Sequence, residues 1–292
     1  MHIVIPDDYQ DAVRSLTCFE KLSGHQVTIF NDTVSDTDAL AERFRDADAL
    51  VLIRERTSID AALLEKLPRL KLIAQTGRGT AHIDVEECAR RGIRVATGTG
   101  SPHAPAELTW ALILAAMRRI PQEAASARAG RWQSGLGATV RGRTLGVWGL
   151  GKIGTLVAGF GRAFGMNVLD SHANTRDELL EQADVLTLHL RLTPETRGVV
   201  TAADLARMKP TALLVNTARA ELIEPGALVA ALRSGRPGFA AVDVYEQEPT
   251  ADDPLLSMDN VVCTPHLGYV ERDSYELYFG QAFDAVNAFA SP

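Results

Sequence analysis

The chain has 292 residues, of which 46% are hydrophobic and 23% charged; these values are typical of a folded protein of about two domains and exclude a disordered chain or a fibre. A net charge of −7 argues against a general nucleic-acid binder. The longest apolar stretch, Trp110–Met117, is far shorter than the ~20 residues of a membrane-spanning helix. The start shows no cleavable leader, and three widely spaced cysteines favour a reducing compartment over a disulfide framework. We therefore expect a cytoplasmic protein that binds neither nucleic acid nor membrane.

The first hundred residues alternate short aliphatic runs with amphipathic stretches, which predicts βαβ units and a parallel sheet. The predicted strands are His2–Pro6, Gln26–Phe30, Ala49–Ile53, Leu70–Ala74 and Ile93–Ala96. The predicted helical stretches are Asp11–Leu22, Asp36–Phe44, Asp60–Leu67 and Val85–Arg91.

A long helix is predicted from about Pro105 to Arg119, ended by Pro121. Apolar residues nearly encircle it, so it must be buried in a core or against another subunit. Residues 127–143 then bring four arginines and several glycines. We interpret them as an irregular arm, either an oligomer contact or a solvated loop. The buried helix and the arm together predict a two-fold homodimer.

From Thr144 the alternation resumes. The predicted strands are Leu145–Trp148, Asn167–Asp170, Val185–Leu188, Ala212–Asn216, Phe239–Val244 and Val261–Cys263. The predicted helices include Ile153–Phe164, Thr201–Met208 and Glu224–Ser234, the last with Pro225 in its first turn.

Two such α/β units in succession predict an α/β fold with two doubly wound parallel-sheet domains, Rossmann-like and flavodoxin-like, and a cleft between them. A final helix, Arg272–Phe289, carries an apolar stripe that must be buried elsewhere. We therefore expect residues 1–98 plus 270–292 to form a substrate domain and 99–269 a cofactor domain.

A glycine-rich turn, Gly149-Leu150-Gly151-Lys152-Ile153-Gly154, matches the dinucleotide-binding pattern G-x-G-x-x-G. The pattern is weak alone, but here it directly follows a predicted strand and opens a predicted helix. Gly149 permits a tight turn, Gly151 lets the backbone approach a pyrophosphate, and Gly154 allows close helix–strand packing. The alternative is a purely structural turn.

Three chemically capable side chains follow three successive predicted strands: Arg219, Glu248 and His266. Strand ends of a parallel sheet share one edge, so the three can converge there. An arginine can bind a carboxylate through two hydrogen bonds, and a carboxylate beside a histidine favours its protonated form, which can donate a proton. Taken singly, Arg219 is as easily a surface ion pair, and His266 or His189 a structural histidine.

These motifs resemble the D-isomer-specific 2-hydroxyacid dehydrogenase family. The resemblance also includes Gly79 to Asp84 and Ala106-Glu107-Leu108-Thr109. It implies that Arg219 holds the substrate, that Glu248 orients His266 and that His266 is the general acid/base. It also implies that backbone N–H groups at Arg78 and Gly79 bind the substrate carboxylate.

The expected cofactor is NAD or NADP. Its expected contacts are the glycine turn with Lys152 and Ile153, and then Asp170, Thr217, Ala218 and Asp243. The implied reaction is the interconversion of a small 2-oxo acid and a D-2-hydroxy acid. No metal is expected, because neither H-E-x-x-H nor C-x-x-C occurs. The alternatives are a nicotinamide-sensing corepressor of the same fold and a formate- or phosphite-type dehydrogenase.

Two departures from the family pattern stand out. Ala81 occupies a position where the family usually has Asp or Asn. In the family, the second strand of this unit is followed by an acidic residue, a loop, a third strand and a helix. In this chain the stretch from Asp170 to Asp184 is shorter than that pattern by a segment on the order of twenty residues. A strand at the edge of a sheet can be absent without disrupting the other strands. The segment that would flank the adenosine ribose of the cofactor is then absent too. We therefore predict weak cofactor binding that discriminates poorly between NAD and NADP.

Overall fold

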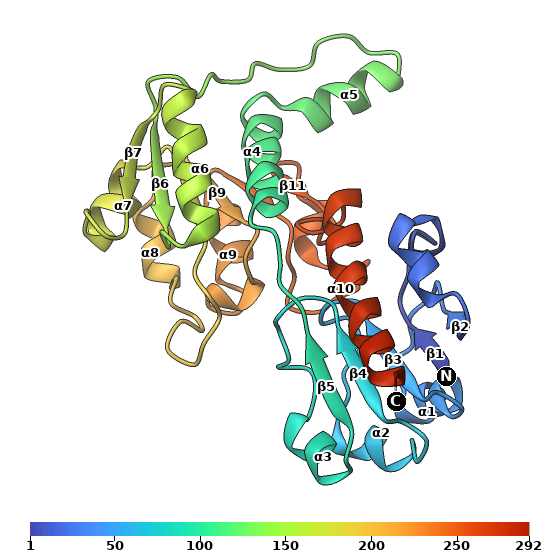
Figure 1. Cartoon of the computed structure of the whole chain (residues 1–292). Coiled ribbons are helices and arrows are strands. Elements are labelled where there is room, and N and C mark those ends of the chain that lie inside the picture. Colours follow the sequence, from blue (N-terminus) through green and yellow to red (C-terminus); the bar gives the residue numbers. More distant parts are fainter. Residues whose placement is uncertain (292) are drawn as a thin grey trace. The chain divides into compact units, whose positions relative to one another are not determined.

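The computed structural model describes residues 1–291, which fold into two compact units (Figure 1). The first unit comprises Met1–Ser101 and the segment that starts at Glu271. The second unit comprises Pro102–Val270. The chain thus leaves the first unit once and returns to it for helix α10 (Arg272–Ala290). A cleft between the units stays a prediction.

The first unit contains a five-stranded parallel sheet in the order β2-β1-β3-β4-β5. Its strands are β1 (His2–Ile5), β2 (Gln26–Ile29), β3 (Ala49–Leu52), β4 (Leu72–Gln75) and β5 (Arg94–Thr97). Helices α1 (Thr37–Phe44), α2 (Ala61–Glu65) and α3 (Val85–Arg90) share one apolar cluster with the sheet. Helix α10 packs against β4 and the 3₁₀ helix η2 (Thr17–Leu22), where Phe279 and Phe283 are buried.

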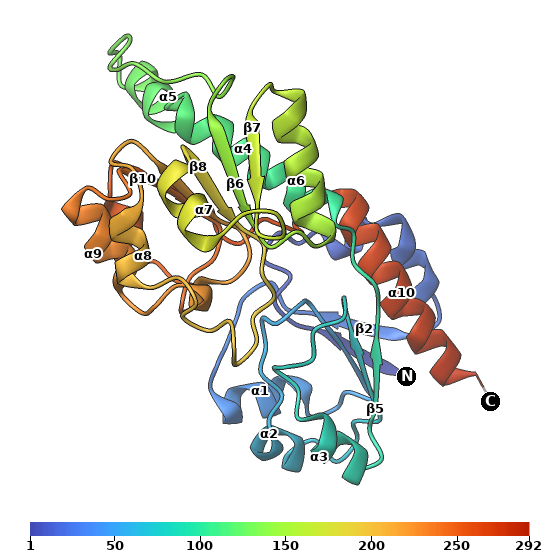
Figure 2. The same ribbon diagram turned by 90° about the vertical axis from the view of Figure 1, so that its left-hand side faces the viewer.

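The second unit contains a six-stranded parallel sheet in the order β11-β10-β9-β8-β6-β7. Its strands are β6 (Thr144–Trp148), β7 (Asn167–Asp170), β8 (Val185–Leu188), β9 (Leu213–Asn216), β10 (Phe239–Val242) and β11 (Val261–Cys263). Helices α4 (His103–Met117) and α6 (Lys152–Ala163) cover one face. Helices α7 (Arg176–Gln182), α8 (Ala202–Arg207) and α9 (Ala227–Ser234) cover the other (Figure 2). The two α/β sheets confirm the predicted fold class.

Side-chain caps determine where many of these helices begin. The carboxylates of Asp36, Asp60 and Asp84 each accept a backbone N–H of the first turn of α1, α2 or α3. Thr175 and Thr201 form reciprocal capping boxes with Glu178 and Asp204 at α7 and α8. Each cap satisfies an N–H that has no partner within the helix and contributes about 1 kcal/mol.

The predicted helix Asp11–Leu22 is wrong. The segment forms two 3₁₀ helices, η1 (Val13–Ser15) and η2, with Leu16 extended between them. Asp11 adopts a left-handed backbone (φ 48°), and the Asp8 carboxylate accepts the N–H groups of Ala12 and Val13. These local bonds compete with the α-helical ladder and prevent it from starting.

Two further helix boundaries also differ from the prediction. Arg119 is left-handed (φ 55°), so α4 ends before it and a separate helix, α5 (Ile120–Arg128), occupies the start of the predicted irregular arm. Pro121 lies in the first turn of α5, where its missing N–H costs nothing. Helix α9 begins after Gly226 (φ 71°), so Pro225 precedes the helix instead of opening it.

The shortened connection after β7 is accommodated as predicted. Strand β7 is the edge of the sheet beside β6, and α7 packs against β6 before the chain enters β8. Leu179 and Leu180 of α7 are buried in the core of that face. The sheet is therefore complete without a strand beyond β7.

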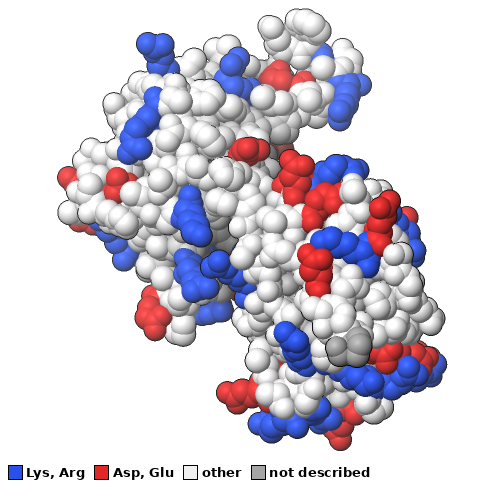
Figure 3. All heavy atoms as spheres, in the orientation of Figure 1, with Lys and Arg blue, Asp and Glu red and all other residues white. Residues whose placement is uncertain are grey.

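No helix within residues 1–291 is long and apolar enough to cross a membrane. Basic and acidic side chains alternate over the face of the first unit that carries α10 (Figure 3). One such pair is Lys21 and Asp284, whose Nζ and Oδ2 atoms are 2.7 Å apart.

Candidate active site

The candidate site lies in the second unit, at the edge of the sheet where the parallel strands end. Strand β6 leads into the glycine turn, β9 into Thr217–Arg219, β10 into Asp243 and β11 into Thr264–His266. Because β9, β10 and β11 are direct neighbours, the segments that follow them lie side by side.

The glycine turn fits a dinucleotide pyrophosphate. Gly149 has a φ of 106°, and a β-carbon there would lie 2.7 Å from the backbone carbon of His189. A β-carbon on Gly154 would overlap the carbonyl oxygen of Gly149. Gly151 is the exposed N-cap of α6 and provides no side-chain cap, so the first N–H groups of this twelve-residue helix are available to an anion.

The loop after β7 is held by hydrogen bonds among its own residues. Asp170 Oδ1 accepts the N–H groups of His172 (2.9 Å) and Ala173 (3.1 Å), and Asn174 Oδ1 accepts the N–H of Asp170 (3.1 Å). The Ser171 hydroxyl accepts the N–H of Gly149 at 3.1 Å, which ties this loop to the glycine turn. One oxygen of Asp170 is thus used within its own turn, and a contact between Asp170 and the cofactor stays a prediction.

His266 and Glu248 form a hydrogen-bonded pair. His266 Nδ1 lies 2.5 Å from Glu248 Oε2, and the other carboxylate oxygen accepts the N–H of Tyr245 at 2.9 Å. The side chains keep 25% and 31% of their surface exposed, so the pair is accessible. His266 has a left-handed backbone (φ 54°), which is uncommon for a residue other than glycine and typical of functional sites.

Asp243 holds the segment that carries His266. Its buried carboxylate accepts the Thr264 hydroxyl (2.6 Å) and the N–H groups of Leu267 (2.7 Å) and Gly268 (2.9 Å). Burial raises the pKa of the Asp243 carboxyl, and these three donors oppose the increase. The structure therefore gives Asp243 a positioning role, and its predicted place beside the nicotinamide stays a prediction.

Asn216 and Tyr245 were not among the predicted site residues. Asn216 is buried at the end of β9, donates to the Arg219 carbonyl (2.8 Å) and accepts the Ala218 N–H (3.0 Å), so it shapes the turn carrying Arg219. Tyr245 orients Glu248 through its N–H and donates its hydroxyl to the Thr264 carbonyl at 3.0 Å. The signal that could have identified Asn216 is a polar residue at the end of an otherwise apolar strand, and Tyr245 directly follows the predicted strand Phe239–Val244.

Other predicted residues lie at the same strand ends. Thr217 shares a hydrogen bond with Thr109 of α4, with 2.8 Å between the two hydroxyl oxygens. His189 follows β8, and its Nε2 lies 3.0 Å from the Thr187 hydroxyl. Burial lowers the pKa of His189 to about 4, which fits the structural alternative for this residue. Among residues 1–291, no group of His, Cys, Asp and Glu side chains could hold a metal ion.

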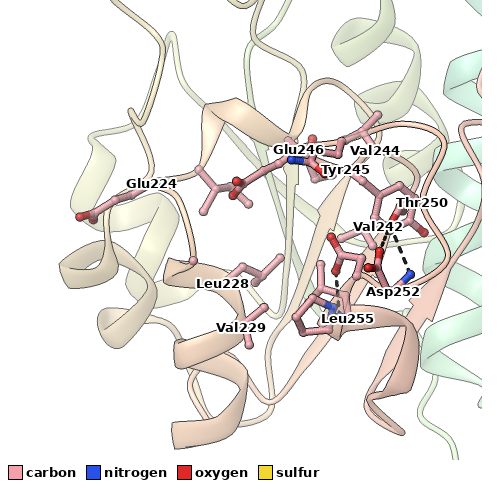
Figure 4. Close-up of a pocket in the computed structure, with 17 residues that line it drawn as sticks. Glu224, Leu228, Val229, Val242, Val244, Tyr245, Glu246, Thr250, Asp252 and Leu255 are labelled. Carbon is pink, nitrogen blue, oxygen red and sulfur yellow. Dashed lines mark hydrogen bonds between the residues drawn. The ribbon is translucent and has the colours of Figure 1, made fainter. Parts of the chain in front are cut away.

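A cavity of about 360 Å³ lies beside these segments, between α9 and the loop that follows β10 (Figure 4). Leu228, Val229 and Leu255 form its apolar wall, and Glu246 also lines it. Asn216 and Tyr245 line it too, so the cavity borders the turns that carry Arg219 and Glu248. No pattern in the sequence had indicated it.

The predicted substrate loop belongs to the first unit. Arg78 and Gly79 follow β4, and Arg78 is exposed. Strands β3 and β4 pair in parallel with Leu52 opposite Gln75, so residues 53–56 leave the sheet at the same edge as this loop. Ala81 is exposed farther along the same segment.

Comparisons with known proteins agree on one family. The family described as "D-isomer specific 2-hydroxyacid dehydrogenase, NAD binding domain" matches residues 110–268. A glyoxylate reductase from Aeropyrum pernix is 40% identical over 280 residues, covering 87% of this chain and 83% of that enzyme. A phosphoglycerate oxidoreductase from Vibrio cholerae O395, known from its crystal structure, is 53% identical with a TM-score of 0.96, covering 99% of each chain.

Not every relative is matched over its whole length. A D-3-phosphoglycerate dehydrogenase from Methanocaldococcus jannaschii is 41% identical over 249 residues, which cover 79% of this chain but 47% of that enzyme. The chain therefore spans about half the length of this relative.

Proposed function

The chain belongs to the D-isomer-specific 2-hydroxyacid dehydrogenase family and is an NAD-binding oxidoreductase, and we propose that it interconverts a small 2-oxo acid and a D-2-hydroxy acid. The hydrogen bond between His266 and Glu248 is the observation that carries this proposal. Such a pair, at the edge of the sheet where the glycine turn lies, suits a reaction in which one proton moves as the carbonyl is reduced.

His266 is the proposed general acid. Its Nδ1 is engaged by Glu248, which leaves Nε2 to donate a proton to the carbonyl oxygen of the substrate during reduction. Glu248 fixes the orientation of the ring through this hydrogen bond, and the Tyr245 N–H fixes Glu248 in turn. Asp243 accepts the Thr264 hydroxyl before His266 and the Leu267 N–H after it, so the donor is preorganised.

Arg219 is the proposed partner of the substrate carboxylate, together with backbone N–H groups at Arg78 and Gly79. A guanidinium stays charged at every working pH and binds a carboxylate through two parallel hydrogen bonds. The cofactor would be held by the glycine turn with Lys152 and Ile153, and by Thr217 and Ala218. When bound, the reduced nicotinamide supplies the hydride.

A substrate panel tests the proposed function. The purified chain is mixed with NADH or NADPH and, in turn, with glyoxylate, hydroxypyruvate and pyruvate, and loss of the reduced cofactor is followed by absorbance. We expect turnover of at least one acid. Cofactor binding without turnover of any 2-oxo acid would contradict the proposal and favour a nicotinamide-sensing protein.

We also propose a two-fold dimer that buries α4 and the segment after it. Two apolar side chains of the irregular arm, Trp132 (81%) and Leu136 (97%), are almost fully exposed in the single chain, as is typical of an interaction surface. Light scattering at micromolar concentration is expected to give twice the 31.5 kDa mass of one chain, and a 31.5 kDa particle would contradict the dimer. The three free thiols fit the proposed cytoplasmic location.

A further inference from the structure

Two threonine hydroxyls meet at the end of β9, and one of them belongs to a motif to which the proposed function gives no role. Thr109 is the last residue of Ala106-Glu107-Leu108-Thr109, which lies on α4. Its side chain is fully buried, whereas Thr217 is partly exposed where β9 ends. Because the two hydroxyl oxygens are 2.8 Å apart, the motif reaches the proposed cofactor contact Thr217 through one hydrogen bond.

The direction of this hydrogen bond follows from the second partner of Thr109. The Thr109 hydroxyl oxygen lies 2.7 Å from the Pro105 carbonyl oxygen, and a carbonyl oxygen can only accept. A hydroxyl carries a single hydrogen, so Thr109 donates to Pro105 and accepts from Thr217. With the opposite direction, the Thr217 hydrogen would have no acceptor among residues 1–291, and one hydrogen bond would be lost.

The end of β9 therefore presents an acceptor to the site. The single hydrogen of the Thr217 hydroxyl is used towards α4, so only the lone pairs of its oxygen remain for a ligand. The N–H of the next residue, Ala218, is also used, because it donates to Asn216 Oδ1 at 3.0 Å. A ligand group that donates a hydrogen bond suits this position, and a group that can only accept does not.

Helix α4 holds the Thr109 hydroxyl in place. The adjacent Trp110 is buried, donates its indole N–H to the Val157 carbonyl of α6 at 3.1 Å, and stacks on Phe164 with ring centroids 4.8 Å apart. The helix also packs against β9, β10 and β11. The acceptor at Thr217 is thus oriented before any ligand binds, so binding does not have to order it.

The position of β9 in the sheet indicates which part of a dinucleotide lies there. The glycine turn follows β6, and in this fold the adenosine half extends towards the strand after the first helix, which is β7 here. Strand β9 lies two places from β6 on the other side, about 9–10 Å away at the usual strand spacing. A ribose and a nicotinamide ring span such a distance, and the carboxamide is the group on that half that carries N–H donors.

We propose that Thr109 is a positioning residue for the cofactor: it orients the Thr217 hydroxyl so that the oxygen accepts an N–H of the nicotinamide carboxamide. This inference rests on the contact between Thr217 and the cofactor in the proposed function. Thr109 itself does not touch the cofactor. The chain should therefore bind NAD more tightly than its 3-acetylpyridine analogue, which keeps the carbonyl but has a methyl group in place of the amide nitrogen and its two hydrogens.

The test measures the dissociation constants of NAD and of the 3-acetylpyridine analogue by calorimetry, which needs no turnover. Thr109→Val should weaken NAD about tenfold and the analogue less than threefold, because only NAD loses a hydrogen bond. Thr109→Ser keeps the hydroxyl and should keep the wild-type ratio of the two constants. Thr187→Val is the matched control, because it removes another buried hydroxyl from the neighbouring strand β8, and it should leave the ratio unchanged.

A double substitution tests whether Thr109 acts through Thr217. Thr217→Val alone should shift the ratio about as much as Thr109→Val, and adding Thr109→Val to it should shift the ratio no further. A ratio within threefold of wild type in either single valine variant overturns the inference, and so does a second shift of equal size in the double variant. If the ratios shift as expected but no 2-oxo acid is reduced, the inference is supported and the proposed function fails.

Discussion

Replacing Asp243 with alanine tests whether this buried carboxylate holds the proposed acid in place. The substitution removes the acceptor for three donors: the Thr264 hydroxyl, Leu267 N–H and Gly268 N–H. The hydroxyl can turn to the Val242 carbonyl, which is already 3.5 Å away, but the two N–H groups lose their partner. Each unsatisfied buried donor costs about 1–3 kcal/mol.

The expected net loss is about 2–4 kcal/mol. The burial that raises the pKa of Asp243 also makes its charge costly, so removing the charge offsets part of the penalty. For a unit of this size, that loss corresponds to a fall in Tm of roughly 5–15 °C. Freed from Asp243, the segment around His266 can shift by about 1 Å, which can lower kcat on the order of a hundredfold.

Thermal unfolding followed by circular dichroism and kcat with the best 2-oxo acid measure the two effects. Asp253→Ala is the control, because it removes a single hydrogen bond to the Leu255 N–H in the neighbouring loop. It should cost no more than about 1 kcal/mol and leave kcat unchanged. If Asp243→Ala has the Tm and kcat of wild type, Asp243 does not position His266.

Three further outcomes are expected. His266→Ala should lower kcat by about 10²–10⁴-fold, and Glu248→Gln should also lower kcat, because the ring loses the carboxylate that orients it; near-normal turnover of His266→Ala would place the proton donor elsewhere. Fluorescence titration should give dissociation constants for NADH and NADPH within about tenfold of each other, because the sequence predicts that the segment after Asp170 lacks a wall beside the adenosine ribose; tight and strongly NAD-selective binding would contradict this. The free energy of unfolding should fall by up to about 3 kcal/mol as the pH falls from 6.5 to about 4. Burial lowers the pKa of His189 from 6.5 to about 4 in the folded chain, so over this range the unfolded chain takes up a proton that the folded chain does not. If His189→Gln has the same pH dependence of stability as wild type, the effect does not come from His189.

The strands were predictable because each is a short aliphatic run with both faces buried. Ala49–Leu52 and Val185–Leu188, for example, are buried at every position and stand out in the sequence without any knowledge of their neighbours. The pairing of His266 with Glu248 was foreseeable for a related reason, since both follow strands that the topology places side by side. Hydrophobic pattern and topology therefore determine most of this site.

What could not be predicted depends on single backbone conformations and on contacts between side chains far apart in the sequence. Asp11 and Arg119 adopt left-handed backbones, which interrupt helices that the sequence predicts. Neither aspartate nor arginine predicts such a conformation from its residue type alone. Tyr245 gains its role from its backbone N–H, which donates to the carboxylate of Glu248, and Asn216 gains its role from the turn that it closes. The Glu55 carboxylate lies against Gly79, and the neighbouring Arg54 has a left-handed backbone that its residue type does not predict.

The return of the chain to its first unit has a consequence for the timing of synthesis. Helix α10 is synthesised after the whole second unit. The five-stranded sheet therefore lacks the helix that packs against β4 while Pro102–Val270 is translated. At about 5–20 residues per second that interval is on the order of ten to thirty seconds. During this interval, the side of the first sheet against which Phe279 and Phe283 later pack is not yet covered by α10. The second unit is continuous in sequence, so the helices on both faces of its sheet can form without waiting for a later segment. We therefore expect the second unit to be native in the nascent chain before the first, and mutations that weaken α10 to lower the yield of folded protein more than its stability once folded.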